Sequence, residues 1–163
     1  HVFVEKPLCS SLEETDRIIT ARKKSGTVGQ VGYMKVHDPA FIQAKQEVET
    51  MDNIQFVQVN HLHPNNSLHM CQFDVRRFDD MIQDSLTQQK EAADIATYAG
   101  GSKQAIGDVE PHVQGAFSLL SGSMIHDIYG MRVMLGMPKR VVSTEIWRRG
   151  RAITYTLEYF SLH

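Results

Sequence analysis

Short apolar runs bounded by turn-forming residues alternate along this chain with longer stretches in which apolar residues recur every three or four positions. The short runs predict strands and the longer stretches predict helices. In the first part of the chain the predicted strands are residues 2–5, 28–34 and 54–59. The first of these is expected to be buried, because Val2, Phe3 and Val4 are all apolar.

Two helices are predicted between these strands, each with a recognisable start. The first begins with a capping box, formed by Ser10 with Glu13 or by Ser11 with Glu14, and ends before Gly26. The second begins where an aspartate N-cap precedes a proline in the first helical position, and it covers about 38–48. The order strand, helix, strand, helix, strand indicates an α/β or α+β layer structure.

The middle of the chain, from residue 67 to about 111, loses strand character. Helix-forming residues return at 87–98, and the pair Gly100 and Gly101 is expected to end that helix.

The last third of the chain combines a helix with a hairpin. The helix carries His126 near its first turn, after the small residues 121–123, and ends at Gly136. The hairpin is predicted from two strand patterns with a turn at Gly150 between them, at 140–147 and 152–160.

Composition narrows the class of protein. The 163 residues carry a formal net charge of −2, which fits one domain with no basic surface for nucleic acid. No apolar run reaches the roughly 20 residues that cross a bilayer, and no signal peptide is recognised. Cys9 and Cys71 are far apart, which favours a reducing, cytoplasmic setting. Because the chain starts and ends on strand patterns without an initiator methionine, we expect it to be part of a longer protein.

Two ionisable residues are candidates for chemistry. Lys6 lies at the carboxyl end of the first strand, where open α/β sheets bind ligands, although a surface lysine could stand there equally well. His126 has an imidazole that can exchange a proton near neutral pH, but a histidine on an apolar helix is more often structural.

His61 and His63 form a third candidate, because residues two apart on a strand face the same side. Such a pair can hold a metal, but a polar strand end is favoured here since no third ligand is indicated nearby. The glycines at 26, 29 and 32 do not have the GxGxxG spacing, so the chain has no dinucleotide fingerprint.

Several motifs, taken in order, resemble the glucose–fructose oxidoreductase and inositol dehydrogenase (Gfo/Idh/MocA) family. The opening strand followed by Glu5-Lys6-Pro7 is similar to its EKP motif, and 31–41 is similar to its segment with Asp-Pro-Ala-Phe. Residues 122–129, with Gly136 ten residues after the histidine, resemble its D-x-x-x-H-x-[IL]-D helix. The resemblance covers 1–66 and 115–160, and the stretch between looks like an insertion at about 67–111.

The resemblance implies a fold and a domain division. Residues 1–25 would be the end of a dinucleotide-binding Rossmann domain. Residues 26–163 would form a substrate-binding and oligomerisation domain with an open mixed β-sheet and helices on one face, like the C-terminal domain of glyceraldehyde-3-phosphate dehydrogenase. A homo-oligomer is expected through that sheet, where apolar residues offer area, among them Val141, Ile146, Trp147, Ile153 and Tyr155.

The resemblance also implies an activity: hydride transfer between a sugar or polyol hydroxyl and NAD or NADP. Lys6 and His126 would be catalytic, with Lys6 orienting the hydroxyl and His126 exchanging its proton. Glu5, Lys6 and Pro7 would border the cofactor, which the missing N-terminal part would mainly bind. The implied substrate-binding residues are Lys35, His61 and His63.

Two positions depart from the family's histidine motif. Gly122 and Tyr129 stand where the motif has aspartates, and Asp127 points about 100° away from His126 on a helix. A diverged domain that binds or assembles without catalysis is therefore one alternative. A metal-dependent hydrolase built on His61, His63 and His126 is the second.

Overall fold

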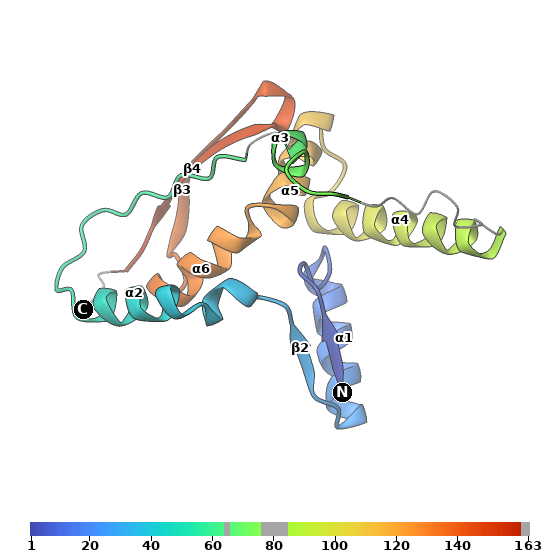
Figure 1. Ribbon diagram of the computed structural model, residues 1–163, viewed down its shortest axis with the longest axis horizontal. Coiled ribbons are helices and arrows are strands. Elements are labelled where there is room, and N and C mark those ends of the chain that lie inside the picture. Colours follow the sequence, from blue (N-terminus) through green and yellow to red (C-terminus); the bar gives the residue numbers. More distant parts are fainter. Residues whose placement is uncertain (64–65, 76–84, 161–163) are drawn as a thin grey trace.

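The computed structural model describes residues 1–63, 66–75 and 85–160, and it is a mixed α/β structure (Figure 1). Strand β1 (Val2–Val4) and strand β2 (Gly29–Val31) pair in parallel, joined by helix α1 (Leu12–Ser25). The first strand is confirmed, but the prediction that it is buried is wrong, since Phe3 is 63% exposed. One helix can cover only one face of a two-stranded sheet, so side chains on the other face stay exposed to solvent.

Local capping signals define α1. Ser11 is the N-cap, and its hydroxyl accepts a hydrogen bond from the backbone N–H of Glu14 at 3.2 Å. The Glu14 carboxylate in turn accepts from the backbone N–H of Ser10. This confirms the second of the two predicted capping boxes, and the helix ends as predicted at Gly26, which has a φ of 65°.

A 3₁₀ turn, η1 (Met34–His37), leads into helix α2 (Pro39–Glu49), whose predicted Asp38 cap accepts from the N–H of Ala40 at 2.8 Å. The strand predicted at 54–59 is wrong: this stretch runs as an irregular chain from α2 towards helix α3 (Asn66–Met70). A strand needs a partner for its backbone groups, and no described residue pairs with this one.

Helix α4 (Ser85–Ile106) continues through the two glycines that were expected to end it. Gly101 is buried, and a Cβ there would lie 3.0 Å from the Cβ of Ser10 and closer still to the Glu14 carboxylate. The glycine thus allows α4 to pack closely on the start of α1, and this packing outweighs its low helix propensity.

Helix α5 (Pro111–Gly122) was not predicted as a separate helix, and it leads through Ser123 and Met124 into helix α6 (Ile125–Leu135). As predicted, α6 carries His126 in its first turn and ends at Gly136. The small core lies here, since among the described residues the buried apolar side chains are Ala116 of α5 and Tyr129 and Leu135 of α6.

The predicted hairpin is confirmed. Strands β3 (Arg140–Trp147) and β4 (Ala152–Glu158) pair antiparallel around the short turn η2 (Arg148–Gly150). The turn packs closely on α5. A side chain at Gly150 would overlap the backbone of residues 112–116. The hairpin is therefore attached to the helices at its tip.

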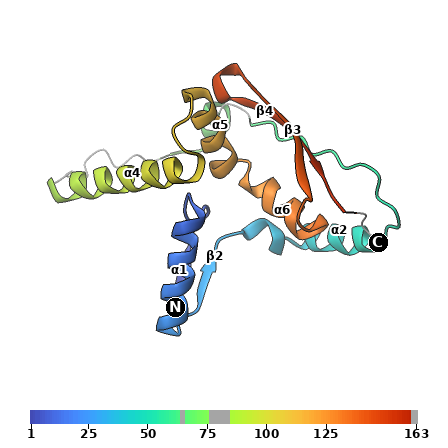
Figure 2. The same ribbon diagram turned by 180° about the vertical axis from the view of Figure 1, so that it is seen from behind.

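The two strand pairs remain separate, so the described residues form two small sheets and not the open mixed sheet that was expected. Figures 1 and 2 show the β1–α1–β2 unit and α4 extending away from the central α5–α6 region. Among the described residues, no helix has both the length and the apolar character needed to span a membrane.

Candidate functional site

Lys6 follows β1 and reaches the junction between α5 and α6. Its ammonium group donates a hydrogen bond of 2.6 Å to the backbone carbonyl of Gly122. The peptide bond between Lys6 and Pro7 is cis, and the Glu5 carboxylate accepts from the Lys6 backbone N–H at 3.3 Å. Gly122, which stands where the family motif has an aspartate, therefore binds Lys6 through its backbone carbonyl oxygen.

His126 projects from the first turn of α6 and is bound on one side. Its Nδ1 lies 2.6 Å from the hydroxyl of Tyr129. That hydroxyl also accepts a bond of 3.3 Å from the backbone N–H of Lys35, which can only donate. The bond from Lys35 leaves the tyrosine's own proton free to be donated to Nδ1, and in that arrangement a neutral His126 carries its proton at Nε2.

Electrostatics connect the same residues. Burial lowers the pKa of His126 below its ordinary value, and the positive charges of Lys6 and Lys35 lower this pKa further. The carboxylates of Asp127 and Glu5 act in the opposite direction. Lys6, Lys35 and Glu5, which come from the N-terminal part of the chain, thus lie close enough to His126 to influence its charge.

His61 is fixed from two sides by the α5–α6 junction. Its Nδ1 lies 2.5 Å from the Asp127 carboxylate and its Nε2 lies 3.1 Å from the Ser123 hydroxyl. The ring of His63 is stacked near that of His61, with centroids 6.0 Å apart. The two histidines do lie together, although the strand from which this was predicted does not form.

The structure therefore brings the sequence-predicted residues Glu5, Lys6, Lys35, His61 and His126 to one region, and their functional roles stay predictions. Sequence reasoning missed the serine at 123 and the buried tyrosine of α6 as partners of the two histidines. It also set aside Asp127, because on α6 this carboxylate points away from His126. In the structure the Asp127 carboxylate binds the imidazole of His61 and not that of His126.

A metal site is not supported within the described residues, where His, Cys, Asp and Glu do not gather in any group of three that could hold an ion.

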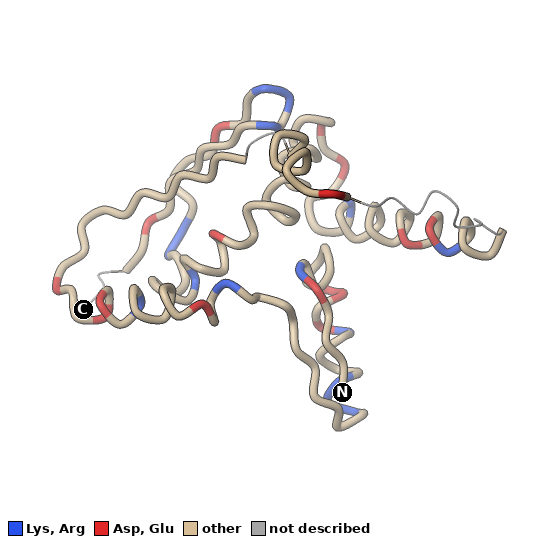
Figure 3. The backbone as a smooth tube through the Cα atoms, in the orientation of Figure 1, with Lys and Arg blue, Asp and Glu red and all other residues tan. Residues whose placement is uncertain are grey.

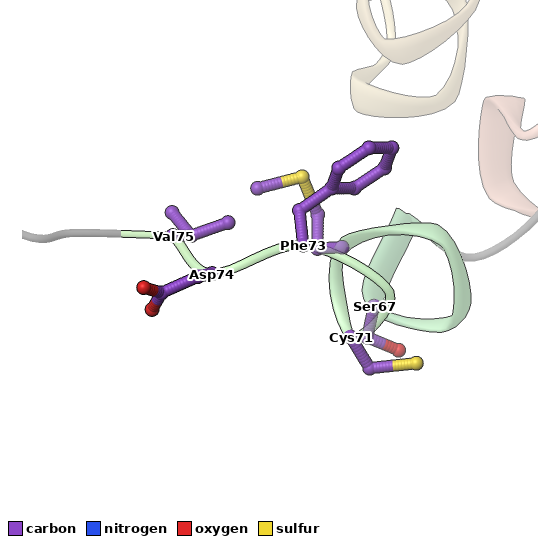
Figure 4. A pocket seen from close by; sticks show the side chains of 6 residues that line it. Ser67, Cys71, Phe73, Asp74 and Val75 are labelled. Atoms are coloured by element: carbon purple, nitrogen blue, oxygen red, sulfur yellow. The ribbon is translucent and has the colours of Figure 1, made fainter.

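A hollow of about 650 Å³ lies elsewhere, on α3 and the residues that follow it (Figure 4). Its described lining residues include the Cys71 thiol and the Asp74 carboxylate. Lys and Arg residues are spread over the chain, with a group at the tip of the hairpin (Figure 3).

Comparison with known proteins relates part of the chain to oxidoreductases. One relative, named scyllo-inositol 2-dehydrogenase (NAD(+)) from Bacillus subtilis (strain 168), is 44% identical over 48 residues, which are 29% of this chain and 14% of that protein. Another from the same organism, named uncharacterized oxidoreductase YrbE, is 43% identical over 49 residues, 30% of this chain and again 14% of the relative. No protein-family model and no solved structure matches the chain.

Proposed function

We propose that this chain supplies the substrate side of an oxidoreductase that transfers a hydride between a hydroxyl group of a sugar or polyol and NAD or NADP. The observation that carries the proposal is the meeting of Lys6 with the start of α6, where its ammonium binds the Gly122 carbonyl and its charge acts on His126. Two groups that exchange protons or bind a hydroxyl oxygen are what such a reaction needs from the protein.

In this proposal Lys6 holds the substrate hydroxyl. An ammonium group has three N–H donors, and the Gly122 carbonyl occupies one of them. The remaining donors are available to an oxygen of the substrate. His126, protonated at Nε2 when neutral, donates a hydrogen bond to the same hydroxyl or to the carbonyl oxygen of the product.

The residues that would contact a nicotinamide cofactor lie at the carboxyl end of β1. Parallel strands bind ligands beyond their carboxyl ends, and Glu5, Lys6 and Pro7 follow β1 directly in a parallel pair. These residues would border the cofactor, which supplies the hydride acceptor. The phosphate groups would be held outside this chain's described residues, because no glycine-rich fingerprint is present among them. In this scheme 1–25 belong to the nucleotide-binding half and 26–163 to the substrate half.

A homo-oligomer is part of the same proposal. Three apolar side chains of β3 are accessible, with Val141 59%, Val142 48% and Trp147 46% exposed. Burying such a surface against a second copy would remove it from water, and this is the expected role of the hairpin.

The test is reduction of NAD⁺ or NADP⁺ by the intact protein, followed spectroscopically with scyllo-inositol, other inositols and simple sugars. We expect reduction that depends on at least one polyol and on one of the two cofactors. Cofactor and polyol that both bind without any reduction would favour the alternative of a diverged binding domain and contradict the oxidoreductase proposal.

A further inference from the structure

His61 joins two residues of the α5–α6 junction, Ser123 and Asp127, in a continuous chain of hydrogen bonds beside the predicted catalytic pair. The Ser123 hydroxyl lies 3.1 Å from Nε2 of His61, and Nδ1 of His61 lies 2.5 Å from the Asp127 carboxylate. Ser123 caps the end of α5, and the aspartate stands in the first turn of α6. All three residues are partly buried.

The carboxylate determines which nitrogen of His61 carries the proton. An ionised aspartate only accepts hydrogen bonds, so Nδ1 of His61 must be the donor. In the neutral ring Nε2 is then an acceptor, and it receives the hydroxyl proton of Ser123. The same order of hydrogen bonds makes a serine hydroxyl reactive in serine hydrolases, where the histidine takes its proton and the carboxylate stabilises the resulting imidazolium.

His126 has the opposite arrangement. The Tyr129 hydroxyl, which accepts from the Lys35 N–H, can donate its own proton to Nδ1, and the outward nitrogen then carries the proton of the neutral ring. In this tautomer His126 donates through Nε2 but cannot accept a proton there. The oxidation of an alcohol needs an acceptor, and the geometry points to a different group for that role.

We propose that Ser123 accepts the proton of the substrate hydroxyl and passes its own proton to Nε2 of His61, with Asp127 as the positioning residue. This rests on the proposed oxidoreductase function. In the step, the C–H hydride leaves with its electron pair for the oxidised nicotinamide, the O–H proton moves to the serine oxygen, and the carbonyl double bond forms. The serine stays neutral and His61 becomes an imidazolium. Carbonyl reduction follows the same route in reverse.

The location of Lys6 supports this assignment. Its ammonium binds the carbonyl of Gly122, which belongs to the peptide group that joins Gly122 to Ser123. The ammonium that would hold the hydroxyl therefore binds the residue next to the serine. The titratable and charged groups around the two imidazoles are His63 on the irregular chain, Tyr155 of β4 beside Asp127, and Glu5, Lys6 and Lys35 near His126.

The first test reads the proton positions without any need for turnover. In protein labelled with ¹⁵N at histidine, above the pH at which both rings lose their charge, long-range ¹H–¹⁵N spectra should show His61 protonated at Nδ1 and His126 at Nε2. Asp127→Asn should abolish the preference of His61 for a proton at Nδ1 and leave the proton of neutral His126 at Nε2. A wild-type His61 protonated at Nε2 would overturn the relay, whether or not the protein is an oxidoreductase.

The second test is kinetic. Ser123→Ala should lower kcat for polyol oxidation about 100-fold or more, whereas Ser123→Thr, which keeps the hydroxyl, should recover much of it. Ser118→Ala is the matched control, because the hydroxyl of this α5 serine donates to the Gln114 carbonyl of its own helix. The fall in kcat/KM on the acidic side of the pH profile should disappear in His61→Gln and persist in His126→Gln.

The reverse result, with the acidic limb lost in His126→Gln and kept in His61→Gln, would overturn the relay. The variants also separate the two proposals. A protein that depends on Lys6 but not on Ser123 remains an oxidoreductase without this relay. A protein that Lys6→Ala leaves fully active contradicts the proposed function itself.

Discussion

Replacing Lys6 by alanine in the intact protein is expected to lower kcat/KM for polyol oxidation about 100- to 10,000-fold, the range typical of a group that stabilises or exchanges a proton in the transition state. The ammonium is anchored on the Gly122 carbonyl and directed to the start of α6. Its removal takes away the proposed donor to the substrate hydroxyl and one of the charges that act on His126. The rate of NAD(P)⁺ reduction at limiting polyol measures this effect.

Loss of the hydrogen bond to Gly122 also lowers the free energy of unfolding, by about 1–3 kcal/mol for a bond from a charged group, and denaturant unfolding measures this effect separately. Lys24→Ala is the matched control, since Lys24 lies in the exposed last turn of α1. Lys6→Arg should restore little activity, because a planar guanidinium does not replace a compact ammonium at this site. A kcat/KM that stays at the wild-type value in Lys6→Ala would remove the lysine from the mechanism.

Gly150→Ala is expected to destabilise the protein by about 3 kcal/mol or more, because two costs add at this residue. Its φ of 85° is unfavourable for any residue with a side chain. The new methyl group would also lie 2.9 Å from the backbone nitrogen of Ala116 and overlap the carbonyl of His112. Backbone atoms of a helix cannot move aside as a flexible side chain can, so the hairpin tip would separate from α5.

The control for this prediction is Gly26→Ala. Gly26 has a similar φ of 65°, but a Cβ there would meet nothing within 4 Å. Only the backbone cost then remains, about 1 kcal/mol. Urea unfolding of both variants measures the difference. Equal destabilisation of the two would show that the packing of η2 on α5 contributes nothing.

The elements that sequence reasoning predicted correctly are those whose signals are local. The caps at Ser11 and Asp38 and the stops at Gly26 and Gly136 act within one or two turns of their own helix. The hairpin around Gly150 is likewise set by neighbouring residues. Such features depend little on the rest of the fold, so a single sequence is sufficient to recognise them.

The errors concern long-range contacts. The run at 54–59 has the composition of a strand but no described partner, and α4 passes through Gly101 because of its packing on α1. The site shows the same division. Lys6 and His126 could be named from their motifs, whereas the bond between His61 and Ser123 joins residues 62 positions apart, for which no sequence pattern is known.

If the Lys6 ammonium and the His126 imidazole share one site, the pKa of His126 must respond to the charge of Lys6. An NMR titration of His126 measures this response most directly. The positive charge of Lys6 lowers the pKa of His126, so Lys6→Gln should raise this pKa. It should stay below the ordinary value, because burial and Lys35 continue to act, and Lys24→Gln should leave it unchanged. A His126 that titrates identically in the wild type and in Lys6→Gln would contradict a shared site.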